Sequence, residues 1–124
     1  MMLTIQLDWE NALIMLPILV GGIFIIAGII MFLFPPKKIN NLYGYRTPSS
    51  MKNQERWDFA QSYSSKLMIK IGVIYFSTFI LGFFLKPNSL LGIVLTLILF
   101  IALVVILFIK TEKAIKSKFS NKNE

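Results

Sequence analysis

The chain contains no cysteine and no histidine among its 124 residues. Without cysteine it has no disulfide framework, no thiol nucleophile and no zinc–thiolate site. Without histidine it lacks the commonest general base and the commonest metal ligand. Acidic residues are also scarce, with six against thirteen lysines and arginines, and none interrupts a long apolar run, where a charge would mark an ion or proton path. We therefore expect no enzyme, no cofactor and no metal site, and a transporter ranks equally low.

Apolar residues make up 56% of the chain, which is more than a soluble domain of this size can bury. Three runs, at residues 12–34, 67–85 and 90–109, are long and apolar enough to cross a bilayer core of about 30 Å. We expect an all-α integral membrane protein, with three transmembrane helices in a single membrane domain that spans residues 1–124. Lys70 is the only charge inside these runs, and its long stem can carry the ammonium back to the headgroups.

Lysine and arginine are unevenly distributed among the segments between the runs. The first 11 residues carry none, residues 35–66 carry six, residues 86–89 carry one and the tail at 110–124 carries five. Because cytoplasmic loops are enriched in these residues, we predict an outside N-terminus and a cytoplasmic C-terminus. Segment 35–66 and the basic tail then lie in the cytoplasm. The four-residue connection at 86–89 makes the last two spans an antiparallel hairpin.

Segment 35–66 divides into a loop and an amphipathic helix. Pro35 and Pro36 end the first helix, because proline has no amide hydrogen. Thr47 and Pro48 have the pattern of an N-cap followed by a first helical residue, so we expect a helix from about residue 48 onward. It either lies in the membrane interface or runs straight into the second span. One face is expected to carry Trp57, Ala60, Ser64, Leu67 and Ile71, with Trp57 and Tyr63 as interfacial aromatics and Lys52, Glu55, Gln61 and Ser62 as polar positions.

The sequence YGYRTP, residues 43–48, has more contact-forming side chains than a turn requires. Its glycine permits positive φ, its tyrosines add apolar area with a hydroxyl group, and its arginine offers a planar set of donors to carboxylates or phosphates. One interpretation is a loop folded under the bundle, with Arg46 paired to Glu55, to Asp58, to backbone carbonyls or to a lipid phosphate. The other is a partner-binding surface. The candidate partner-binding residues are Tyr43, Gly44, Tyr45, Arg46, Thr47, Pro48, Lys52, Arg56 and Trp57.

The stretch NNLYGYRTPSSMKNQERWDFA, residues 40–60, follows one apolar span with a PPKK stop and precedes two further spans. In this setting it resembles the signature of the SdpI/YfhL family of bacterial membrane proteins. The resemblance implies a plasma-membrane protein that gives immunity to a secreted toxin peptide, and the founding member also draws a cytoplasmic repressor to the membrane. This chain is similar to the SdpI domain alone, so immunity carries over more directly than repressor capture.

The expected partners are anionic lipid headgroups, a toxin peptide and a cytoplasmic repressor, whereas nucleic acid is not expected. The toxin is expected at the spans or at the outer residues Asp8, Trp9 and Glu10. A second hypothesis is a small accessory or scaffold subunit, or an oligomer, because three glycine-bearing helices leave packing surface unfilled. The basic tail is expected to continue the third helix for a few turns, and its terminal SNKNE is expected to be disordered.

Overall fold

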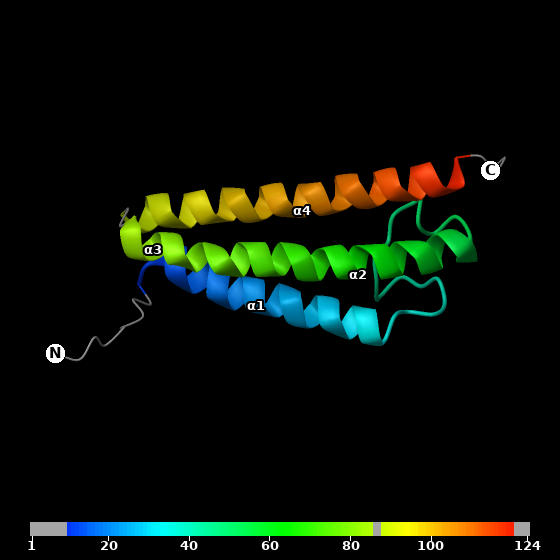
Figure 1. Cartoon of the computed structure of the whole chain (residues 1–124), viewed down its shortest axis with the longest axis horizontal. Coiled ribbons are helices and arrows are strands. Elements are labelled where there is room, and N and C mark those ends of the chain that lie inside the picture. The colour runs from blue at the N-terminus through cyan, green and yellow to red at the C-terminus, as the bar shows by residue number, and fades with distance from the viewer. Residues whose placement is uncertain (1–9, 86–87, 121–124) are drawn as a thin grey trace.

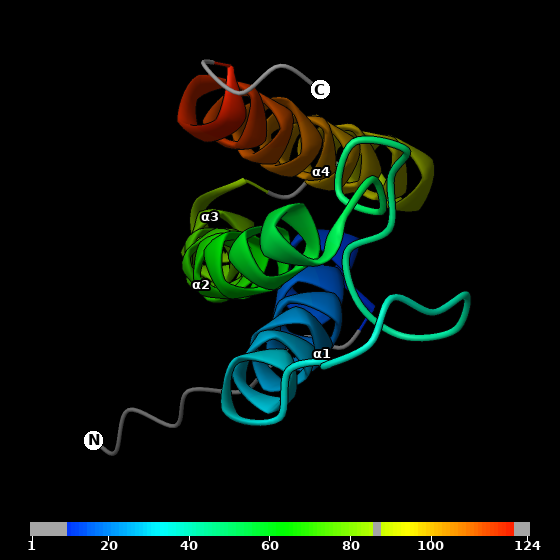
Figure 2. The ribbon, with the colours of Figure 1, turned by 90° about the vertical axis from the view of Figure 1, so that its right-hand side faces the viewer.

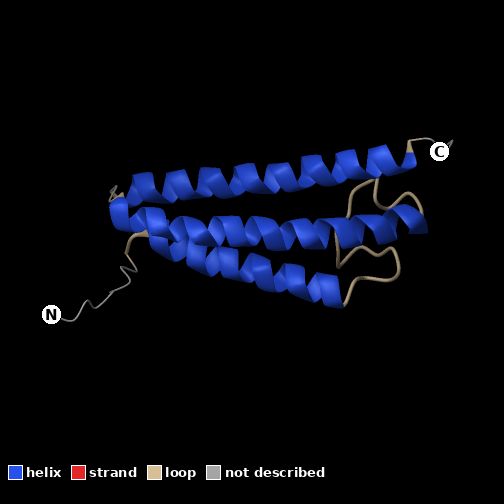
Figure 3. Cartoon of the chain, viewed as in Figure 1, coloured by secondary structure: helices blue, strands red, loops and turns tan. Residues whose placement is uncertain are grey.

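The architecture is an all-helical bundle in a computed structural model that describes residues 10–85 and 88–120 (Figures 1 and 3). The elements are α1 (Ala12–Leu33), α2 (Gln54–Ser77), the 3₁₀ turn η1 (Thr78–Ile80), α3 (Leu81–Phe84) and α4 (Ser89–Phe119). Three helical stretches, with α2 to α3 counted as one, are long and apolar enough to cross a membrane. The chain is therefore a multi-pass membrane protein. The expectations for Asp8 and Trp9 and for the last four residues lie outside the described part.

Helices α1 and α2 approach each other closely at glycines. A Cβ atom placed on Gly21 would lie 2.9 Å from backbone atoms of Phe76, and one placed on Gly72 would lie 3.0 Å from the amide nitrogen of Ile25. Gly28, seven residues after Gly21, also faces α2. In lipid, helices associate through such close van der Waals packing, because the lipid tails are as apolar as the side chains. The glycines are packing sites, as expected, and the structure assigns them to the α1–α2 contact.

The second helix begins at Gln54, so the predicted helix start at Thr47 and Pro48 is wrong. Asn53 is the N-cap, and its side-chain oxygen accepts a hydrogen bond of 2.9 Å from the amide of Arg56, the third residue of the helix. Thr47 begins only a single isolated turn, which ends before Asn53. From Gln54 the helix continues without a break into the second apolar run and ends at Ser77. The amphipathic part and the second span are thus one helix, which was one of the two predicted arrangements.

The second span does not remain one regular helix to its end. The hydroxyls of Ser77 and Thr78 bond to carbonyl oxygens three residues earlier, at 2.7 and 2.6 Å, and such side-chain bonds compete with the helical ladder. The chain passes through η1 into the short α3 at this point. Asn11, which caps α1, also donates to the carbonyl of Gly82 at 2.9 Å. This bond ties the start of α1 to α3.

Residues 34–53 join α1 to α2 and are called the connector below. In Figure 1, α1 and α4 diverge from α2 toward the end that carries the connector. Figure 2, a view onto that end, shows the connector along the side between α1 and α4. A small core there consists of Tyr45, Ala60, Ile115 and Phe119, with Phe59 packed against it. The tail of the chain takes part in this core because α4 continues to Phe119, which confirms the predicted extension of the third helix.

Candidate functional site

Gln61 of α2 holds the connector backbone at Tyr45. Its Oε1 accepts a hydrogen bond from the Tyr45 amide at 2.7 Å, and its Nε2 donates to the Tyr45 carbonyl at 2.8 Å. Gln61 is only 1% exposed, and buried backbone groups need such partners. The expectation that Gln61 lies on the polar face is therefore wrong. It follows Trp57 by four residues and shares the buried face of the helix.

Gly44 allows the connector to reach Gln61. Its φ angle is +110°, which lies in the region that residues with a Cβ atom rarely adopt. A Cβ atom at this position would also lie 2.5 Å from Oε1 of Gln61 and 2.7 Å from Cγ of Pro36. Glycine is therefore required here both by the backbone conformation and by the close approach of the two neighbouring side chains.

Glu112 of α4 accepts hydrogen bonds from two connector side chains. The hydroxyls of Tyr45 and Thr47 each donate to its Oε1 at 2.7 Å. The Tyr45 ring packs against Phe108, with ring centroids 5.4 Å apart. Burial raises the pKa of Tyr45 above its ordinary value, and the hydrogen bond to Glu112 and the negative charge of that carboxylate raise it further. Tyr45 is therefore a neutral hydrogen-bond donor at physiological pH.

Ser50 closes the connector on itself beside this carboxylate. Its hydroxyl accepts a hydrogen bond from the Thr47 amide at 2.9 Å and lies 3.0 Å from the Tyr45 carbonyl oxygen. The Ser50 amide in turn donates to the Thr47 hydroxyl at 3.1 Å. The Thr47 side chain is thereby aimed at Glu112. We call the four residues Tyr45, Thr47, Gln61 and Glu112 the latch.

Two further aromatic side chains form hydrogen bonds to the first residues of the connector. Trp57 is fully buried, and its Nε1 donates to the carbonyl of Pro36 at 2.7 Å. Tyr43 donates through its hydroxyl to the carbonyl of Phe34 at 2.7 Å. The interpretation of Trp57 as an interfacial aromatic is wrong, because its ring lies inside the protein. Tyr63 remains partly exposed on α2.

The cationic members of the predicted site are dispersed. Arg46 is exposed and donates to the backbone carbonyl of Asn41, one of the partner types that the sequence left open. Asp58, another of its suggested partners, accepts from Gln54 at 2.8 Å. The Arg56 guanidinium lies 5.5 Å from the centre of the Phe119 ring. Lys52 and Pro48 are exposed.

The structure thus joins Tyr45 and Thr47 in one hydrogen-bonded group, and it adds two residues that the sequence analysis missed, Gln61 and Glu112. A signal for Gln61 was present in its spacing from Trp57. The signal for Glu112 is weaker: it is the first acidic residue after the charge-free run at residues 90–109. Nothing in the sequence indicates that its partners lie in the connector.

Most of the connector, all of α2 and most of α4 lie in the part of the chain that matches a known family, and Glu112 lies one residue beyond it. The SdpI/YfhL protein family matches residues 37–111. The chain belongs to this family. A relative in Bacillus subtilis (strain 168), the uncharacterized protein YfhL, is 48% identical over 96 residues, which cover 77% of this chain and 82% of the relative. No solved structure matches the chain. The SdpI/YfhL resemblance inferred from residues 40–60 is therefore confirmed.

Proposed function

We propose that this SdpI/YfhL-family protein gives a bacterium immunity to a secreted toxin peptide, as a non-catalytic protein of the plasma membrane. The observation that carries the proposal is the family match over residues 37–111. The three helices able to cross a membrane agree with it. A non-catalytic role also agrees with the latch, because each of its polar side chains is bonded to another residue and fixes the connector.

The proposal includes an orientation in which the connector and the end of α4 face the cytoplasm. Its support is the excess of lysine and arginine in segments 35–66 and 110–124. Because the chain has no native cysteine, single cysteines can report this directly. In intact cells, a membrane-impermeant maleimide should label Leu85→Cys and leave Leu42→Cys unlabelled until the membrane is permeabilised. The opposite labelling pattern would reject the orientation.

Immunity is tested by expressing the protein in a sensitive indicator strain and adding filtered culture medium from the toxin-producing strain. The wild type and Ser62→Ala, a change at an exposed position of α2, should restore growth. Arg46→Ala and Tyr45→Ala should protect less, because they alter the exposed and the buried part of the connector. Equal membrane levels of all variants are required. Absence of protection by the correctly inserted wild type would reject immunity.

Capture of a cytoplasmic repressor is a separate part of the proposal, and it concerns the exposed part of the connector. Leu42 is 92% exposed and Tyr43 is 38% exposed, and Arg46 is exposed beside them. Tyrosine and arginine side chains are among those that dominate binding energies at interfaces, and Leu42 adds exposed apolar area beside them. Tyr45 and Trp57 are buried, so this conformation does not offer them to a partner.

The capture can be followed with a fluorescent fusion of a DNA-binding repressor from the source organism. It should move to the membrane when the protein and the toxin-containing medium are both present, and Leu42→Asp should abolish the movement. Ser62→Ala is again the matched control. A repressor that stays on the nucleoid in all cells would remove this part of the proposal and leave immunity intact.

A small accessory subunit remains the alternative function, and the outward face of α4 favours it. Ile98 and Ile101 are both 59% exposed, which leaves room for a further helix as well as for lipid. Purification in a mild detergent distinguishes the two functions. A stoichiometric unrelated membrane protein would support the accessory role, whereas a monomer or a homogeneous homo-oligomer would support the immunity protein.

A further inference from the structure

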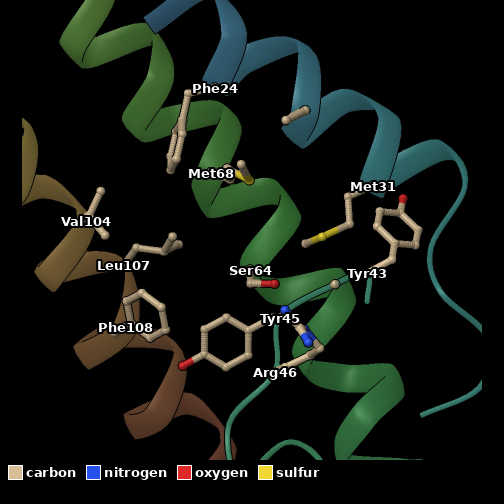
Figure 4. A pocket seen from close by; sticks show the side chains of 12 residues that line it. Phe24, Met31, Tyr43, Tyr45, Arg46, Ser64, Met68, Val104, Leu107 and Phe108 are labelled. Carbon is tan, nitrogen blue, oxygen red and sulfur yellow. The ribbon is translucent and has the colours of Figure 1, made fainter. Parts of the chain in front are cut away.

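A cavity of about 440 Å³ lies between the three long helices at the connector end (Figure 4). Figure 4 shows its walls: Phe24 and Met31 from α1, Ser64 and Met68 from α2, and Leu107 and Phe108 from α4. The cavity is not enclosed, because Phe108 is 44% exposed. A volume of this size is typical of small-molecule sites, which are mostly apolar with a few polar groups.

The two ends of the cavity differ in character. At the far end, the rings of Phe24 and Phe100 meet edge to face with centroids 5.6 Å apart. At the near end lie the connector residues Tyr43 to Arg46. Among the described residues that line the cavity, Arg46 alone carries a charge. The cavity therefore changes from apolar to cationic along the helices, in the same direction as a lipid changes from chain to anionic headgroup.

Arg46 retains donors for such a headgroup. A guanidinium has five N–H donors in a planar arrangement that suits phosphate oxygens. The structure uses one nitrogen of Arg46 for the carbonyl of Asn41, and the side chain is exposed. The bond to Asn41 positions the guanidinium at the mouth of the cavity without neutralising its charge.

We propose that this cavity binds one acyl chain of an anionic phospholipid, with the lipid phosphate held by Arg46. The proposal goes beyond immunity and does not depend on it. It gives the exposed arginine of the YGYRTP stretch a lipid ligand.

The dimensions of the cavity favour a hydrocarbon chain over a peptide helix. From Phe24 to Met31 the cavity extends along seven residues of α1, or about 10 Å. A helix with a diameter of about 10 Å would occupy roughly 800 Å³ over that length, well above the 440 Å³ present. An extended acyl chain is much thinner than a helix, so a segment of it can occupy this volume.

The test uses the full chain in detergent and native mass spectrometry, with phosphatidylglycerol and phosphatidylcholine of identical chains as probes. We expect one retained phosphatidylglycerol per protein and weaker binding of phosphatidylcholine. Arg46→Gln should lower the affinity for phosphatidylglycerol about fivefold, since one cation near an anionic lipid contributes about that factor. It should lower phosphatidylcholine binding by a smaller factor, because the choline ammonium of that lipid already compensates the charge of its phosphate. Lys38→Gln, which removes an exposed connector charge outside the cavity, is the matched control.

A second pair of variants tests the chain-binding part of the cavity. Ala27 lines the cavity, whereas the neighbouring Ile26 is 60% exposed and faces outward. Ala27→Phe should lower the affinity for both lipids at least about fivefold, because its ring would occupy space in the cavity that the acyl chain needs. Ile26→Phe should not lower it. If Ala27→Phe does not fold, Ala27→Leu replaces it with a smaller obstruction.

Three outcomes would overturn the proposal. The first is equal effects within either pair of variants. The second is a set of equivalent, weakly held lipids in place of one retained lipid. The third is displacement of the retained lipid by inorganic phosphate or by an apolar helical peptide, which would show that the site recognises a free anion or a peptide instead.

Discussion

Tyr45 donates a hydrogen bond of 2.7 Å to Glu112, a residue 67 positions further along the chain. This contact joins the connector, which leaves α1, to the last helix of the bundle. Thr47 donates to the same carboxylate oxygen, and Gln61 fixes the backbone of Tyr45 from α2. The three long helices are therefore coupled at one end through the connector.

The bond between Tyr45 and Glu112 should contribute measurably to stability. Tyr45→Phe keeps the ring contact with Phe108 and removes the hydroxyl, so we expect a loss of about 1.5 kcal/mol, typical of a hydrogen bond to a charged group. Stability is measured by reversible unfolding in mixed micelles. In a double-mutant cycle with Glu112→Ala, the coupling energy should be about 1 kcal/mol. Tyr63→Phe, at a partly exposed position of α2, should change stability little, and additive effects in the cycle would contradict the bond.

The raised pKa of Tyr45 predicts a loss of stability in alkaline solution. The ordinary pKa of tyrosine is 10.0, and that of folded Tyr45 lies above it. Below pH 10 the hydroxyl is neutral in both states, so its full contribution is present. As the pH rises beyond about 10, the unfolded chain loses this proton first, which favours unfolding. Unfolding free energy measured at pH 8 to pH 11 should fall more for the wild type than for Tyr45→Phe, and parallel curves would contradict the shift.

Gln61 should contribute more to stability than Gln54, the other glutamine of α2. Gln61→Met preserves the approximate volume and removes both hydrogen bonds to Tyr45, which leaves a buried amide and a carbonyl without these partners. The unsatisfied amide costs about 1–3 kcal/mol. The carbonyl keeps the Ser50 hydroxyl 3.0 Å away and loses one hydrogen bond of about 1 kcal/mol, so we expect a total loss of about 2–4 kcal/mol. The same substitution at the exposed Gln54 is the control. Thermal unfolding followed by circular dichroism should separate the two variants, and similar melting temperatures would contradict the role of Gln61 in holding the Tyr45 backbone.

Gly44 should not tolerate alanine. The positive φ of +110° and the 2.5 Å approach to Gln61 Oε1 both penalise a Cβ atom. The conformational part alone costs about 1–2 kcal/mol. Gly22→Ala is the control, because a Cβ atom there meets nothing within 4 Å and alanine favours a helix by about 0.5–1 kcal/mol. The two alanine substitutions should therefore shift the unfolding midpoint in opposite directions, and a shift in the same direction would contradict this interpretation.

The helices themselves were predictable from local features of the sequence. The apolar runs are long and nearly charge-free, and the prolines at 35 and 36 mark the end of α1. The shared face of Trp57, Ala60 and Ser64 was also predicted correctly, and all three are buried. The start of α2 was not, because Thr47 and Asn53 are both good N-caps. In the structure Asn53 caps the helix, and the Thr47 hydroxyl donates to Glu112 instead.

The sequence by itself determined that the chain is a three-helix membrane protein of the SdpI/YfhL family, because hydrophobic length and a contiguous motif are local properties that need no partner to be recognised. Only the tertiary structure decided what the motif contacts. Tyr45 meets residues 16 and 67 positions away, and no periodicity along one helix can encode such a pairing. The physical reason is that buried polar groups must find partners wherever the fold brings them. The positions of Gln61 and Glu112 thus follow from how the helices pack, and not from the order of residues within any one of them.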